Sequence, residues 1–145
     1  MRIAPAFSLF ALAALPAAAQ PPAQPVVQPG LYSISAQIVI PGLPLQMPVM
    51  TFRRCLTPQD IADGQAYASS PNKDCAIDQL SQSADGVSYD FNCAMEGGQR
   101  VIGRASGTTH ATGYDIKMDG RFVPGMQGMS QFSQKLSATR LGDCP

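Results

Sequence analysis

The chain has 145 residues, of which 45% are hydrophobic and 14% charged, and its ten basic residues balance its ten acidic ones. Without a net positive charge or a basic stripe, the composition argues against a nucleic-acid-binding protein and against one held on anionic lipid by a polybasic run. The four cysteines are an even number, which in an exported chain of this size indicates two disulfides.

The first 19 residues have the pattern of a secretory signal peptide. One basic residue, Arg2, precedes an apolar run from Ile3 to Leu15, and a run of alanines ends at Ala19. The apolar run is shorter than the roughly 20 residues that span a bilayer, and Ala-x-Ala is the pattern that signal peptidase cleaves. We therefore predict cleavage after Ala19, a periplasmic location and no integral membrane span in the mature chain.

The mature chain begins with a segment that should not fold. Residues 20–29 (QPPAQPVVQP) contain four prolines and no periodic apolar face, a composition typical of extended, flexible chain. Residues 30–145 are of the size of one domain, and we expect a single β-domain there.

Alternation of apolar and polar residues, which indicates half-buried strands, recurs along this domain. It is clearest in Val87–Met95 and Tyr114–Phe122. Thr57 to Asp60 (TPQD) has the residues of a helix start and predicts a helix of about two turns near residues 58–68. The expected strands are residues 30–40, 49–55, 75–83, 87–95, 100–109, 114–122 and 130–140.

These elements predict an all-β fold. Two segments rich in Pro and Gly, residues 41–48 and 123–129, interrupt the strands and are expected to be apolar loops. Gly103 and Gly107 mark places where a sheet can bend sharply. The natural arrangement is a curved antiparallel sheet or an incomplete up-and-down barrel of about seven strands, with one short helix and two disulfides, because curvature hides the strand edges.

The cysteine pairing can be argued from strand parity. A three-residue turn at Ala84–Gly86 would place Cys75 opposite Met95 and Cys93 opposite Ile77, so that the two cysteines are diagonal neighbours on one face. A small bulge would then bring them to bonding distance. Three pairings of four cysteines are open to the sequence, and this one leaves Cys55 to pair with Cys144.

The second bond would have a topological consequence. Cys55 ends the second expected strand and Cys144 follows the seventh, so both would lie at one end of the sheet. The helical segment would then cross the sheet, and the loops 41–48 and 123–129 would lie together at the opposite end, near the bond between Cys75 and Cys93.

The sequence offers little for catalysis, and we predict a non-enzymatic protein with no cofactor. The single histidine, His110, lies about 13 Å along a strand from Ser106, outside the reach that a base and a nucleophile need. Asp115 and Asp119 have a similar separation, which is too large for a retaining carboxylate pair. No nucleophile elbow, zinc-protease, phosphate-loop or Cys-x-x-Cys motif is present.

The two apolar loops hold the remaining candidates. Each contains a Met-x-x-Met pattern, Met47 with Met50 and Met126 with Met129. Thioether sulfur is a soft ligand suited to Cu(I), which makes these four residues a candidate metal site. Methionine is also frequent on adaptable apolar binding surfaces and as a core gap-filler. On the second interpretation, Leu43, Leu45, Met47, Met126 and Met129 would contact an apolar ligand or partner, and on the third they only pack.

A set of spaced motifs resembles the proteobacterial exported family known as domain of unknown function 3617. The resemblance covers essentially the whole mature chain, with tyrosine at Tyr32 where members often have tryptophan, and leucine at Leu43 and Leu45 where they often have methionine. It implies a periplasmic, disulfide-containing β-domain and transfers no catalytic residue. The motifs are Pro29-Gly30-Leu31-Tyr32, Ile40 to Pro48 (IPGLPLQMP), Cys55-Leu56-Thr57, Asp74-Cys75, Cys93 and Gly142-Asp143-Cys144.

The sequence therefore predicts an exported binding or envelope-associated module. Its ligand or partner would be apolar and would meet the concave face or the apolar loops, and nucleic acid is not expected as a partner. The alternative is a protein that binds a soft metal through the Met-x-x-Met loops.

Overall fold

The computed structural model describes residues 26–42, 47–68, 74–126 and 129–145. The predicted signal peptide and most of the predicted proline-rich lead-in lie outside these residues. Among the helices of the described residues, none has the length and apolar character needed to cross a membrane.

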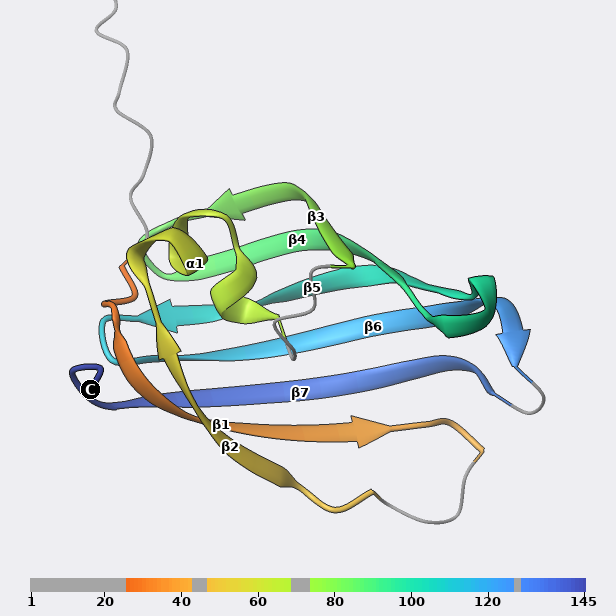
Figure 1. Cartoon of the computed structure of the whole chain (residues 1–145), viewed down its shortest axis with the longest axis horizontal. Coiled ribbons are helices and arrows are strands. Elements are labelled where there is room, and N and C mark those ends of the chain that lie inside the picture. Colours follow the sequence, from red (N-terminus) through yellow and green to blue (C-terminus); the bar gives the residue numbers. More distant parts are fainter. Residues whose placement is uncertain (1–25, 43–46, 69–73, 127–128) are drawn as a thin grey trace, which may run out of the picture.

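Seven strands form one sheet in which every neighbouring pair is antiparallel. The spatial order is β2-β1-β7-β6-β5-β4-β3, so β2 and β3 are free edges and the sheet stays open (Figure 1). This confirms the predicted all-β fold in its open form. The strands are β1 (Gly30–Val39), β2 (Met50–Leu56), β3 (Cys75–Gln82), β4 (Gly86–Ala94), β5 (Arg100–His110), β6 (Gly113–Met126) and β7 (Met129–Gly142).

The predicted loop at residues 123–129 is wrong in its extent, because β6 continues to Met126 and β7 begins at Met129. The pairing of β6 with β7 is irregular between Arg121 and Met126, as expected where proline and glycine interrupt a ladder. On its other side β6 stays paired with β5 as far as Val123. The segment thus continues as strand through Val123, paired with β5, and Met126, paired with Met129 of β7.

The β3–β4 hairpin also differs from the prediction. The prediction placed Ser83 opposite Val87, but Gln82 pairs with Val87, so the register differs by one residue from the turn onward. A bulge between Asp78 and Ser81 changes the register by one further residue. As a result Cys75 lies directly opposite Cys93 rather than diagonal to it. The predicted bulge is real, and both predicted disulfides, Cys75–Cys93 and Cys55–Cys144, are present.

The two faces of the sheet differ as the alternation predicts. Along β1, Tyr32, Ile34 and Ala36 are buried, whereas the serines between them are half-exposed. We call the buried side the inner face and the polar side the outer face. The buried strand residues of the inner face are Tyr32, Ile34, Ala36, Leu56, Val87, Tyr89, Phe91, Ala105, Tyr114, Ile116, Met118, Leu136 and Ala138.

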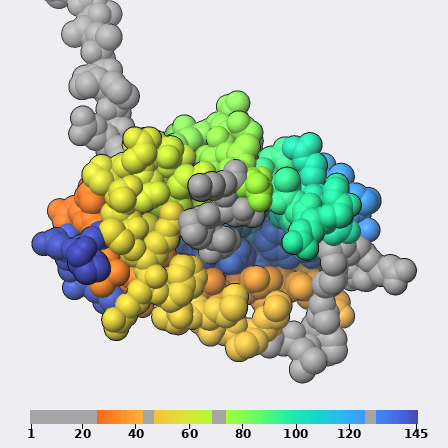
Figure 2. Space-filling view, in the orientation of Figure 1, coloured from red at the N-terminus to blue at the C-terminus, as the bar shows by residue number. Residues whose placement is uncertain are grey.

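The chain passes from the β2 edge to the β3 edge across the inner face. This crossing segment (residues 57–68) contains α1 (Pro58–Ala62) and the 3-10 turn η1 (Gln65–Tyr67). Figures 1 and 2 show it, in yellow and yellow-green, in front of the half of the sheet nearest the C-terminus. The second short turn, η2 (Glu96–Gly98), connects β4 to β5.

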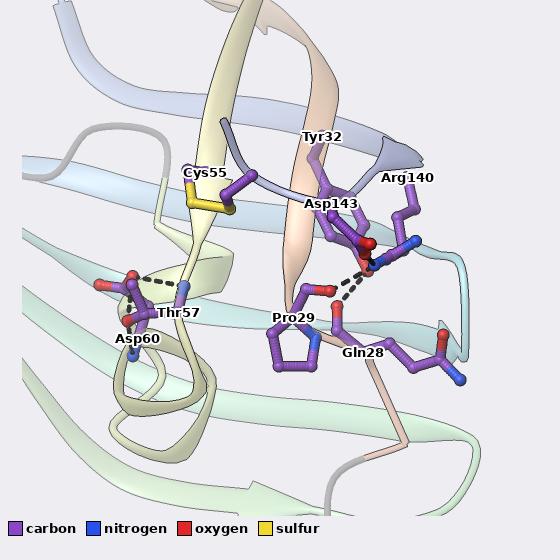
Figure 3. Close-up of a disulfide and its surroundings, with 9 residues drawn as sticks. Gln28, Pro29, Tyr32, Cys55, Thr57, Asp60, Arg140 and Asp143 are labelled. Atoms are coloured by element: carbon purple, nitrogen blue, oxygen red, sulfur yellow. Dashed lines mark hydrogen bonds and ion pairs between the residues drawn. A yellow bond between two sulfur atoms is a disulfide. The ribbon is translucent and has the colours of Figure 1, made fainter.

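The predicted two-turn helix is only one turn long. It begins with a capping box, in which the Thr57 backbone N–H donates to the Asp60 carboxylate at 2.9 Å and the Thr57 hydroxyl accepts from the Asp60 N–H at 3.1 Å. It ends because Gly64 adopts a left-handed φ of 81°, after which η1 turns Ala66 and Tyr67 into the core. Figure 3 shows the box beside Cys55.

Tyrosine hydroxyls attach the crossing segment to the sheet. Tyr114 on β6 donates to the Ala66 carbonyl at 2.8 Å, and Tyr89 on β4 donates to the Tyr67 carbonyl at 2.8 Å. Tyr67 itself donates to the Gln82 side chain at 3.1 Å. Because buried carbonyls need a donor, these bonds fix the height of the segment above the sheet.

The strand register defines two ends of the sheet. The terminal end is where Gly30, Leu56 and Gly142 meet, and it is closed by the Cys55–Cys144 bond and by Arg140, which donates to the Pro29 carbonyl at 2.9 Å (Figure 3). The loop end holds the Cys75–Cys93 bond and the flanks of residues 41–48 and 127–128. The described flanks of both apolar segments therefore lie at the end opposite Cys55–Cys144, and the rest of the two segments lies outside the described residues.

Candidate functional site

The inner face is filled at the terminal end but hollow towards the loop end, where a cavity of about 220 Å³ remains. Five consecutive strands, β3 to β7, each contribute a large apolar side chain to its wall. These are Ile77, Phe91, Val101, Met118 and Phe132. Ala68 of the crossing segment and the Cys75–Cys93 bond also contribute to the apolar lining.

Two glycines that face each other shape this half of the sheet. Gly103 on β5 is the register partner of Gly120 on β6. A Cβ on Gly103 would lie 2.5 Å from the Phe91 ring, and one on Gly120 would lie 2.5 Å from the Phe132 ring. The two rings therefore lie over the bare backbone of these glycines, and larger residues there would push them into the cavity.

Tyr89 separates the cavity from the packed half of the core. It is 1% exposed and lines the cavity, while its hydroxyl donates to the Tyr67 carbonyl. Burial raises the pKa of Tyr89, and the neighbouring Tyr114 and Tyr67 raise it further. The phenol therefore remains a neutral donor at any physiological pH.

The cavity reaches the surface at the loop end. Met95 lines it and is at the same time 42% exposed, so its side chain forms part of the opening. Among the described residues, seven large hydrophobic side chains are exposed, and all but Leu141 lie at the loop end. The exposed apolar side chains of the described residues are thus concentrated at the end where the cavity opens. The six, which we call the apolar rim, are Val39, Met47, Val49, Met50, Met95 and Val123.

The outer face carries an open depression of about 720 Å³, lined mainly by polar and charged side chains. Several of its charges are paired, since Arg104 lies 3.8 Å from Asp90, and Asp119 lies 2.9 Å from Lys117. The hydroxyl of Ser133 and then the Lys117 ammonium, both donating to Asp119, lower the pKa of that carboxyl. Paired charges of both signs on an exposed face are typical of a solvated sheet surface.

Comparison with known proteins supplies a family. The sequence matches the family model described as protein of unknown function (DUF3617) over residues 27–144. The chain belongs to the DUF3617 family. No curated protein and no solved structure shows significant similarity to it.

Of the loop residues predicted to bind in this DUF3617 domain, only Met47 and Met50 have described side chains, and neither is among the described residues that line the cavity. Leu43 and Leu45 lie outside the described residues. Met47 and Met50 belong to the exposed apolar rim, and Met126 and Met129 are backbone partners at the tip of the β6–β7 hairpin, their side chains lying outside the described residues. The copper hypothesis is untested by this arrangement and stays a prediction.

Sequence reasoning missed the residues that form the cavity of the DUF3617 domain, although the signal was present. On β7, Phe132, Leu136 and Ala138 have inward parity, and the same parity places Gln134 between them. A polar residue at an inward position of an apolar face was the available clue. In the described part of the chain, no three His, Cys, Asp or Glu side chains converge as metal ligands would.

Proposed function

We propose that this DUF3617 domain is an exported, non-enzymatic binding module that holds an apolar small molecule in its inner-face cavity. The observation that carries the proposal is the cavity of about 220 Å³, walled by one large apolar side chain from each of five strands. Ligand sites in proteins are typically concave and mainly apolar, with few polar groups. Met95 at the opening and the other residues of the apolar rim at the same end of the sheet support entry of such a molecule from the loop end.

Two disulfides support the exported location. Cys55–Cys144 and Cys75–Cys93 join all four cysteines of the chain, and such bonds persist in secreted and periplasmic proteins but are rare in the cytosol. Expression of the full-length gene should give a periplasmic protein whose measured mass matches a chain that begins at Gln20. Recovery of an intact leader in the cytosol would contradict this part of the proposal.

The binding proposal is tested with N-phenyl-1-naphthylamine, a neutral probe whose fluorescence rises in apolar surroundings. Val101→Phe fills the cavity from β5, and Ile102→Phe makes the same kind of enlargement on the next residue, which points to the outer face. We expect the wild type and Ile102→Phe to bind the probe with similar affinity, and Val101→Phe to bind it at least tenfold more weakly.

Two results would contradict the proposal. The first is a wild-type protein that gives no saturable fluorescence increase. The second is a Val101→Phe protein that is folded, as judged by near-ultraviolet circular dichroism, and binds the probe as the wild type does.

A further inference from the structure

We infer that the cavity selects uncharged apolar molecules that carry one hydrogen-bonding group, and that the Gln134 carboxamide receives this group. The inference rests on the proposed function and goes further, because it names the chemistry of the ligand. Gln134 would be the specificity-determining residue of the site.

Gln134 is an anomaly within the core. Its backbone pairs with Met118 on β6 and Ile38 on β1, and its neighbours on the same face of β7 are Phe132 and Leu136. Only 6% of the residue is exposed, and Thr109 is the only other polar residue that is buried to this degree in the described part of the chain. An apolar face of this kind would normally place leucine or valine at such a position.

The carboxamide of Gln134 has no partner in the described part of the chain. Among the described residues, no hydrogen bond joins its side chain to another residue, and an unpaired buried amide is unfavourable in a protein interior. Yet no side-chain nitrogen or oxygen in the described chain is both sealed from solvent and unpaired. The amide atoms of Gln134 must therefore be reachable by a small molecule, and the cavity that Gln134 lines is the space from which they are reached.

The rest of the lining decides which polar group can pair there. None of the described residues that line the cavity is charged. A carboxylate or ammonium placed beside Gln134 would lose its hydration without gaining an opposite charge, which is strongly unfavourable. A carboxamide offers both a donor and an acceptor, so a hydroxyl, a ketone, an ester or an amide of the ligand can each pair with it.

The experiment compares three ligands that share one apolar body: pentylbenzene, 4-phenylbutan-1-ol and 4-phenylbutanoate, titrated by ligand-observed NMR at pH 7.5. The wild type should bind the alcohol most tightly and the carboxylate at least tenfold more weakly. Gln134→Leu should weaken the alcohol about 5- to 30-fold, the range expected for one hydrogen bond to a buried group, and should leave pentylbenzene unchanged or tighter.

Gln131→Leu is the matched control, because it makes the same substitution on β7 at an exposed position of the opposite face. It should bind all three ligands as the wild type does. Gln134→Met, which keeps an unbranched side chain of similar length, replaces Gln134→Leu if that variant does not give a folded near-ultraviolet spectrum.

The outcomes separate the two proposals. If no ligand of the three binds and the naphthylamine probe does not bind either, the binding function itself is wrong. If pentylbenzene binds as tightly as the alcohol, or if a folded Gln134 variant keeps the affinity of the alcohol, the cavity is an apolar site and the inference about Gln134 is overturned. A carboxylate that binds best would overturn it as well.

Discussion

The tyrosine hydroxyls are the residues on which the crossing segment depends. Tyr114 is 0% exposed and donates to the buried Ala66 carbonyl at 2.8 Å. Tyr32 is equally buried as a residue, but its hydroxyl donates at 2.7 Å to the carbonyl of Gln28, which is exposed. The same chemical change at these two positions should therefore have different consequences, because water can replace the lost donor only at Gln28.

We predict that Tyr114→Phe lowers the free energy of unfolding by about 1 to 3 kcal/mol, since it leaves the Ala66 carbonyl buried without a donor. Tyr32→Phe, the matched control, should lower it by about 1 kcal/mol or less. Urea unfolding followed by circular dichroism measures both. Equal losses in the two variants would show that the bond to the crossing segment has no special role.

For individual residues, the alternation of apolar and polar positions in the sequence identified most side chains of the inner face but not the residues that they contact. The alternation in β6 shows that Tyr114 faces inward, yet nothing local shows that its hydroxyl meets Ala66, which is 48 residues away. Similarly, parity shows that Gln134 faces inward, but the cavity beside it results from Gly103 facing Gly120, a long-range pairing. Such contacts arise from the assembled sheet and leave no local pattern.

At the scale of elements, the two disulfides close loops of very different length. The bond Cys55–Cys144 spans 89 residues and Cys75–Cys93 spans 18. A cross-link stabilises a protein mainly by restricting the unfolded chain, and the restriction grows with the logarithm of the loop length. The bond that ties the last residues to β2 should therefore contribute more than the bond within one hairpin.

We predict that the double variant Cys55→Ala/Cys144→Ala loses about 5 kcal/mol of unfolding free energy, and that Cys75→Ala/Cys93→Ala loses about 3 kcal/mol. Urea titrations of the two variants and the wild type under identical buffer conditions give the comparison. The reverse order of stability would mean that native-state packing around Cys75 and Cys93, rather than the unfolded chain, controls the effect.

The strands and the helix could be predicted from the sequence, but the pairing register of the strands could not. The number of strands, the short helix and both disulfides followed from alternation, capping residues and cysteine parity. The register of the β3–β4 hairpin could not be predicted, because it depends on a bulge at Gln79. This residue has a positive φ of 53°, which is uncommon for glutamine and has no signal in the sequence. The continuation of β6 past Phe122 likewise depends on its neighbours, since Val123 pairs with Arg100 of β5 and Met126 with Met129 of β7.

At the scale of the whole molecule, the sheet combines a fixed end with an open one. The terminal end is closed by a disulfide, by Arg140 and by the crossing segment above it, whereas the loop end keeps the cavity and the apolar rim. The core between the two ends contains all four tyrosines of the chain, and each is only 0 to 1% exposed. The stability of the whole sheet is thereby linked to the protonation of these side chains.

Burial raises the pKa of each of the four tyrosines above the ordinary value of 10.0; for Tyr67, burial and then the nearby Tyr32 raise it to about 12. Since the folded phenols keep their protons where the unfolded ones lose them, the stabilisation is complete below pH 10 and is lost as the pH rises through about 12. Each such tyrosine should lower the unfolding free energy by up to about 1.4 kcal/mol per pH unit in this range.

We therefore predict cooperative alkaline unfolding between about pH 10 and 12, in which tyrosinate absorbance at 295 nm appears together with the loss of the near-ultraviolet circular dichroism signal. Urea unfolding at pH 8, 10 and 11 should show a modest loss of stability between the first two values and a much steeper loss between the second and the third. Tyr114→Phe, with one buried phenol fewer, should show a shallower dependence on pH. A gradual rise of absorbance centred at pH 10 with an intact dichroism signal would show that the phenols are open to solvent, contrary to the packing described above.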